Sequence, residues 1–161
     1  MKFDASQPFD ASPDRVMSVY AEPGTYERLG QLGKLSAPEL VSQSAEGDVV
    51  TIALRYRYVG DLPGGAGRFV KADKISWVQT SRFDLGACTE AITIQPDNYA
   101  DRFQACADAT VTTDADGSTR RVGGEVRIRL PLVGGKVERA IVEGLVEHLD
   151  QEAKAIAALL G

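Results

Sequence analysis

The chain has 161 residues, of which 43% are hydrophobic and 25% charged, and this fits one folded domain over residues 1–161. Its net charge of −5 argues against a nucleic-acid partner, because binding to phosphate backbones needs a strongly basic surface. No apolar run is long enough to cross a bilayer and the N-terminus has no apolar signal core, so we expect a cytoplasmic protein without stable membrane insertion. Arginine outnumbers lysine and alanine is frequent, which is typical of a bacterial protein encoded by GC-rich DNA.

The first 33 residues predict one strand followed by two short helices. Alternation of Phe3, Ala5 and Gln7 indicates a strand in the first ten residues. Ser12 and Pro13 then form a typical helix start, with serine as the N-cap and proline at the first helical position. A second helix is expected after Pro23, and glycines at 30 and 33 limit its length.

From residue 38 the apolar period changes from 3.6 to 2, which predicts six strands. Each has one apolar and one polar face, and short turns join most of them, so we expect an antiparallel meander. Gly123 and Gly124 in the last strand suggest a bulge or a sharp bend. The strands are expected within residues 39–60 as a hairpin, and then within 74–84, 88–95, 102–113 and 119–130.

The two cysteines are expected to remain reduced thiols. Cys88 shares its parity with the inward Ile92 and Ile94, whereas Cys106 lies between inward alanines and faces outward. Neighbouring side chains of a strand point to opposite faces, so the two thiols point apart. No CxxC or histidine pair accompanies them, so no metal site is predicted.

Residues 136–160 predict one long C-terminal helix with a broad apolar stripe. His148 and Glu152 fall on the same stripe, four residues apart, so their side chains can meet. Two interpretations remain open: either the helix lets them reach solvent at one end of the sheet, or they face a hollow between sheet and helix. The stripe consists of Val137, Ile141, Leu145, Leu149, Ile156 and Leu159.

This order of elements resembles the START-like superfamily, also called polyketide cyclase/Bet v 1-like or SRPBCC. The chain is most similar to an uncharacterised bacterial family of about this size within it. The matching segments are "SPDRVMSVY", "DKISWVQ" and "RIRLPLVGGKVERAIVEGL". The resemblance implies an α+β helix-grip fold, in which a curved antiparallel sheet of about seven strands wraps a long C-terminal helix and two short helices follow strand 1. It also implies an apolar ligand, such as a lipid or a polyketide-like ring system.

Other motifs point to no additional chemistry. The glycines of "PGGAG" and "LVGGK" match neither a Walker nor a dinucleotide pattern and are interpreted as chain reversals. Arg55 with Arg57, and Arg127 with Arg129, are expected on solvated strand faces. One histidine and one glutamate are too few for a metal site, and no cofactor is expected.

We therefore expect a cavity between the sheet and the C-terminal helix that binds or carries a hydrophobic small molecule, in a monomer or homodimer. Its mouth is expected near residues 60–72 and the short helices around Tyr20 and Tyr26. Two alternatives stay open: a cyclase or hydratase that uses His148 as acid/base with Glu152, and a protein-interaction module with a filled core. Tyr56, Tyr58, Trp77, Phe83 and Phe103 are the expected walls, Ile141 and Leu145 the helix side, and Gln79, His148 and Glu152 the residues that orient a polar group.

Overall fold

A computed structural model describes residues 1–161 and shows one sheet, three α-helices and two short 3-10 turns. The elements follow the expected order of one strand, two short helices, six strands and a long helix. The strands are β1 (Lys2–Phe9), β2 (Glu39–Glu46), β3 (Val49–Arg57), β4 (Ser76–Asp84), β5 (Thr89–Pro96), β6 (Phe103–Thr113) and β7 (Ser118–Ile128). The helices are α1 (Pro13–Tyr20), α2 (Pro23–Glu27) and α3 (Gly134–Leu160), and the turns are η1 (Ala66–Arg68) and η2 (Ala72–Lys74).

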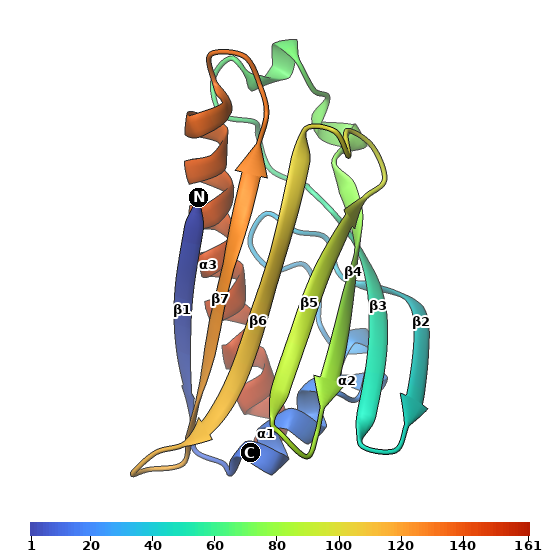
Figure 1. Cartoon of the computed structure of the whole chain (residues 1–161), viewed down its shortest axis with the longest axis vertical. Helices are drawn as coiled ribbons and strands as arrows, with labels where there is room; N and C mark the ends of the chain where they lie inside the picture. Colours follow the sequence, from blue (N-terminus) through green and yellow to red (C-terminus); the bar gives the residue numbers. More distant parts are fainter.

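The seven strands form one antiparallel sheet in the order β1-β7-β6-β5-β4-β3-β2. Strands β2 to β7 lie side by side in the order of the sequence. Only β1 departs from this order, because it pairs with β7 at the edge of the sheet. The sheet curves around α3 (Figure 1). Helices α1 and α2 lie at the end of the sheet where α3 finishes, and the start of α3 lies at the other end. This arrangement confirms the predicted helix-grip fold.

The two short helices begin where the sequence predicted, but α2 is shorter than expected. The Ser12 hydroxyl accepts a hydrogen bond from the Arg15 amide and so caps α1. Helix α2 stops at Glu27, well before the glycines that were expected to limit it. The chain beyond it instead forms single bridges that join Leu35 to Leu32 and to Tyr58.

The predicted bulge at Gly123 and Gly124 is absent. The pairing of β7 with β1 and with β6 runs through both glycines without a shift in register. A Cβ on Gly124 would lie 2.4 Å from the Cys106 carbonyl oxygen and 2.8 Å from the Phe3 ring. Glycine is therefore needed there because a neighbouring strand and an aromatic side chain approach closely.

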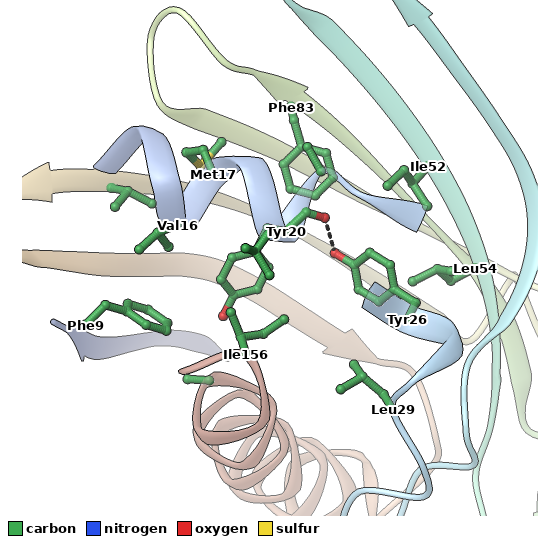
Figure 2. Packing of buried hydrophobic residues seen from close by; sticks show 14 of the residues in the cluster. Phe9, Val16, Met17, Tyr20, Tyr26, Leu29, Ile52, Leu54, Phe83 and Ile156 are labelled. Atoms are coloured by element: carbon green, nitrogen blue, oxygen red, sulfur yellow. Dashed lines mark hydrogen bonds between the residues drawn. The ribbon is translucent and has the colours of Figure 1, made fainter. Parts of the chain in front are cut away.

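The buried side chains form two clusters, one toward each end of the sheet. One, the closed-end cluster, joins α1 and α2 to the last turns of α3 and to β3 and β4. Figure 2 shows Tyr20, Tyr26 and Ile156 meeting there, with the Tyr26 hydroxyl donating to the Tyr20 carbonyl oxygen. The other, the open-end cluster, joins β1, β6 and β7 to the first half of α3 and to the connection that carries η1.

The arginine pair on β3 and the two cysteines lie as the sequence predicted. Ion pairs hold Arg55 to Asp97 and Arg57 to Glu39 on the solvated face of the sheet. Cys88 is buried, Cys106 is exposed, and the two are free thiols, as parity predicted. No helix combines the length and apolar character needed to span a membrane.

Candidate ligand cavity

A cavity of about 240 Å³ lies between α3 and the inner face of the sheet. Of the 24 residues that line it, 16 are hydrophobic. A liquid water occupies roughly 30 Å³, so this space exceeds what a few waters need. The filled-core alternative predicted no such space and is contradicted by this cavity.

Helix α3 contributes one wall of the cavity, and one position of that wall has no side chain. Gly144 lines the cavity, and a Cβ built on it meets no atom within 4 Å. Isoleucine and leucine at positions 141 and 145 flank it and are only half-buried. The stripe predicted from the sequence therefore divides: Leu149 and Ile156 are buried away from the cavity, while Val137, Ile141 and Leu145 line it.

The sheet opens beside the cavity, between β5 and β6. Their pairing begins at Thr89 and stops at the pair Thr93–Cys106. Beyond that pair, residues 94 and 96 of β5 and residues 103–105 of β6 line the cavity. Because β5 stays paired with β4 as far as Pro96, the gap lies on one side of β5 only.

The connection between β3 and β4 covers the same end of the cavity. Asp61, Leu62, Pro63 and Val70 from it are lining residues, as expected for the loop over 60–72. The Tyr58 hydroxyl donates to the Asp61 carbonyl oxygen at 2.6 Å and ties the connection to the end of β3. The short helices do not reach the cavity, because Tyr20 and Tyr26 are buried in the closed-end cluster.

Five of the ten expected ligand-binding residues line the cavity and five do not. Phe83 is fully buried in the closed-end cluster, and Gln79 is half-buried on β4 outside the wall. Tyr56, His148 and Glu152 lie behind the wall, in contact with one another or with a lining residue. The five that line the cavity are Tyr58, Trp77, Phe103, Ile141 and Leu145.

His148 and Glu152 do not reach solvent, so the first interpretation of them is wrong, and neither of them lines the cavity, so the second is wrong too. Only 6% of His148 and 5% of Glu152 are exposed. His148 Nε2 lies 3.6 Å from a carboxylate oxygen of Glu152. Burial by itself would raise the pKa of Glu152, but His148 and the charge of Arg120 lower it below its ordinary value overall.

Sequence reasoning missed a buried ion pair near this carboxylate. The Arg120 guanidinium donates to Glu90 at 2.8 Å, and both side chains are almost completely buried. The guanidinium also lies over the Tyr20 ring, 4.4 Å from its centre. Parity could have found the pair, because Arg120 lies two residues before the inward Val122 and Glu90 lies two before Ile92.

A family model described as "Protein of unknown function (DUF2505)" matches residues 4–160. The chain belongs to the DUF2505 family. No curated protein matches this DUF2505 chain.

Solved structures with the same fold cover 99% of the DUF2505 chain at low sequence identity. TTHA0849 from Thermus thermophilus is 13% identical, with a TM-score of 0.70 over 97% of its own chain. Norcoclaurine synthase from Thalictrum flavum is 18% identical, with a TM-score of 0.67 over 86% of its chain. A START superfamily protein from Mycobacterium smegmatis is 13% identical, with a TM-score of 0.59 over 96% of its chain. These likenesses confirm that the DUF2505 chain has the START-like fold.

Proposed function

We propose that this protein binds an apolar small molecule in the cavity between α3 and the sheet and carries it in solution. The observation that carries the proposal is the cavity itself, which is enclosed mostly by hydrophobic residues and has a polar group only at a few points. Sites for small molecules are usually of this kind, with pocket volumes of roughly 300–1,000 Å³. At about 240 Å³, this cavity suits a ligand of one or two rings or a short acyl chain.

Proteins of similar fold support this choice of ligand class. A structure of norcoclaurine synthase from Thalictrum flavum contains dopamine and hydroxybenzaldehyde, and its chain is 18% identical to this one. The Zhui aromatase/cyclase from Streptomyces sp. R1128 has a TM-score of 0.64. A polyketide-like ring system or a lipid is therefore the ligand class that we propose for this chain.

Binding has more support than the enzymatic alternative. An acid/base role for His148 requires its imidazole to reach the reacting atoms of a substrate. The imidazole lies behind the cavity wall, against Tyr56 and Glu152. The lining residues are mostly apolar, and the titratable ones among them are Lys34, Tyr58, Asp61 and Tyr99.

Filling the cavity from α3 tests the proposal. Gly144→Phe places a ring in the cavity, so we expect the affinity for 2-methylnaphthalene to fall at least about tenfold, or about 1.4 kcal/mol. Gly135→Phe is the matched control, because Gly135 is also helical and open but does not line the cavity. Isothermal titration calorimetry measures both affinities.

A complementary measurement needs no variant. Native mass spectrometry of the purified protein would detect a lipid-sized adduct, and a bound ligand raises the melting temperature. The proposal fails if the wild-type protein carries no adduct and no lipid or aromatic compound raises its melting temperature. Equal binding by the Gly144→Phe and wild-type proteins would also contradict it.

A further inference from the structure

Leu132, in the connection between β7 and α3, is the most exposed large apolar side chain of the protein. Its relative exposure is 103%, whereas that of the four other exposed large apolar residues is 37–49%. Its φ of 65° lies in the left-handed region, which a bulky residue rarely adopts. The Val133 amide donates to the Pro131 carbonyl oxygen at 2.8 Å, so Leu132 is the central residue of a strained γ-turn. A side chain held out in this way adds no packing to the fold, so any apolar contact that it makes lies outside the chain.

The connection that carries this leucine is joined to two others at the same end of the sheet. The Arg129 amide donates to the Arg102 carbonyl oxygen at 2.8 Å, and the Arg102 guanidinium donates to the Phe69 carbonyl oxygen at 2.7 Å. A Cβ on Gly65 would lie 3.2 Å from the side chain of Val133. Figure 1 shows the three connections together where α3 begins. They form one continuous surface, the open-end tip, which consists of residues 58–75, 97–102 and 129–136.

The open-end tip is basic although the net charge of the chain is −5. It contains six lysines and arginines and four aspartates, and one of these aspartates, Asp97, is paired with Arg55 outside the tip. Helix α3 begins here without an acidic residue in its first turn, so the positive end of its dipole adds to the charge. The exposed basic residues of the tip that have no ion-pair partner are Arg68, Lys71, Lys74, Arg129 and Lys136.

The opposite end of the molecule is acidic. Its connections and short helices contain seven aspartates and glutamates and two arginines, in residues 10–28, 47–48, 85–88 and 114–117. Charge is therefore separated along the long axis, and the basic end is the one that carries the exposed leucine. The cavity lies behind the same end, since two of the three connections of the tip contribute to its lining.

An anionic lipid bilayer complements this combination of features. Basic side chains are attracted to lipid phosphates, and an apolar side chain between them can enter the boundary of the acyl chains. The core of a protein interface needs several apolar side chains, but only Leu132 and Val59 are exposed among the large apolar residues of the tip. A second copy of the chain would bring two basic tips together, which like charge disfavours.

We propose that the open-end tip docks on the surface of an anionic bilayer, with Leu132 inserted among the lipids. Docking in this orientation places the cavity next to a store of apolar molecules. The inference goes beyond the proposed function, and the docking itself does not depend on what the cavity binds.

Cosedimentation with lipid vesicles tests the inference. We expect the wild-type protein to bind phosphatidylcholine vesicles that contain about 30% phosphatidylglycerol, at about 50 mM salt. Binding should be at least about tenfold weaker at about 500 mM salt, because salt screens the charges, and at least about tenfold weaker to vesicles of phosphatidylcholine alone.

Leu132→Asn tests the apolar contact. It should weaken binding to the mixed vesicles about tenfold, because it removes the inserted side chain. Asparagine accepts the left-handed region, so the melting temperature should not fall. Val41→Asn is the control, since Val41 is an exposed apolar residue of β2 outside the tip, and its vesicle binding should be unchanged. Leu132→Gly removes the same side chain and serves in place of Leu132→Asn if that variant fails to fold.

A pair of double variants tests the charges. Arg129→Gln with Lys136→Gln should weaken binding at least about tenfold, because each basic residue near an anionic surface contributes about fivefold. Arg15→Gln with Arg28→Gln changes the net charge by the same amount at the acidic end, and both residues are exposed. This control should bind within about twofold of the wild-type protein.

Three results would overturn the inference. They are wild-type binding to neither kind of vesicle, equal loss of binding in the two double variants, and full binding by the Leu132 variants. Binding to polyglutamate without binding to vesicles would assign the tip to an acidic protein partner and overturn it as well. The affinity for 2-methylnaphthalene without vesicles should be the same in all these variants, since none of the substituted residues lines the cavity. Failure of docking with this affinity retained therefore leaves the proposed function in place.

Discussion

At the residue scale, the ion pair of Arg120 and Glu90 is the most demanding feature of the interior. Burying two charges is costly, and the cost is recovered only when each has the other. We therefore expect Glu90→Gln to lower the free energy of unfolding by about 3–5 kcal/mol, because it leaves the Arg120 charge buried without a counter-charge. Urea unfolding monitored by circular dichroism measures this loss.

The double variant Arg120→Met with Glu90→Met separates the charge effect from packing. Since both charges are gone, we expect its stability to return to within about 2 kcal/mol of the wild-type protein. Arg57→Met is the exposed control, and loss of its ion pair with Glu39 should cost at most about 1 kcal/mol. A double variant less stable than Glu90→Gln would contradict this account of the pair.

Residue parity predicted most inward side chains, but it could not say which of them face a ligand. Trp77 and Phe83 share one face of β4, yet Trp77 lines the cavity and Phe83 is fully buried. The difference depends on where α3 crosses the sheet, which no local pattern in the sequence encodes. Charge was the second obstacle, because Arg120 and Glu90 occupy inward positions that a pattern of apolar residues passes over.

At the element scale, α3 consists of two halves with different surroundings. From His148 onward it buries five side chains, whereas from Gly134 to Glu147 only Val137 is buried. The apolar stripe predicted this helix and its contact with the sheet. It could not predict the division, because Ile141 and Leu145 look like core residues in sequence and are half-buried cavity walls in the structure.

The second half of α3 makes stability depend on pH through Glu152. Its pKa in the folded protein lies below the ordinary 4.5 that we take for the unfolded chain, so the folded state binds fewer protons. The resulting stability is fully present above about pH 4.5 and is lost as the pH falls through the lower pKa of the folded state. We expect the difference in unfolding free energy between the wild-type protein and Glu152→Gln to shrink as the pH falls from 6 to 3.

Chemical unfolding at each pH measures this difference. Glu143→Gln is the control, since Glu143 is an exposed glutamate of the same helix without an ion-pair partner. A difference between the wild-type protein and Glu152→Gln that grows as the pH falls would reverse the expected sign and rule out this role for Glu152.

At the scale of the whole molecule, the two ends of the sheet differ, because one carries the closed-end cluster and the other carries the cavity. The closed-end cluster joins α1 and α2 to the end of α3 (Figure 2), and the cavity lies toward the end where β5 and β6 part. The sequence predicted the fold because element order and periodicity define it. A hollow was one of two interpretations of the polar residues on the helix stripe, and the resemblance also implied it, but its position could not be predicted, since cavity volume depends on the summed fit of side chains from many elements.

This asymmetry predicts a gradient of hydrogen exchange along α3. Amides of residues 148–156 should exchange at least about tenfold more slowly than those of residues 138–146, because regions with few buried contacts open at lower free energy. Binding of 2-methylnaphthalene should slow exchange in the first half selectively, since the ligand fills the space beneath it. The paired amides of β6 and β7 serve as the reference for global unfolding. Uniform exchange along the whole of α3, with and without the probe, would mean that the helix opens as one unit and that the cavity does not loosen its first half.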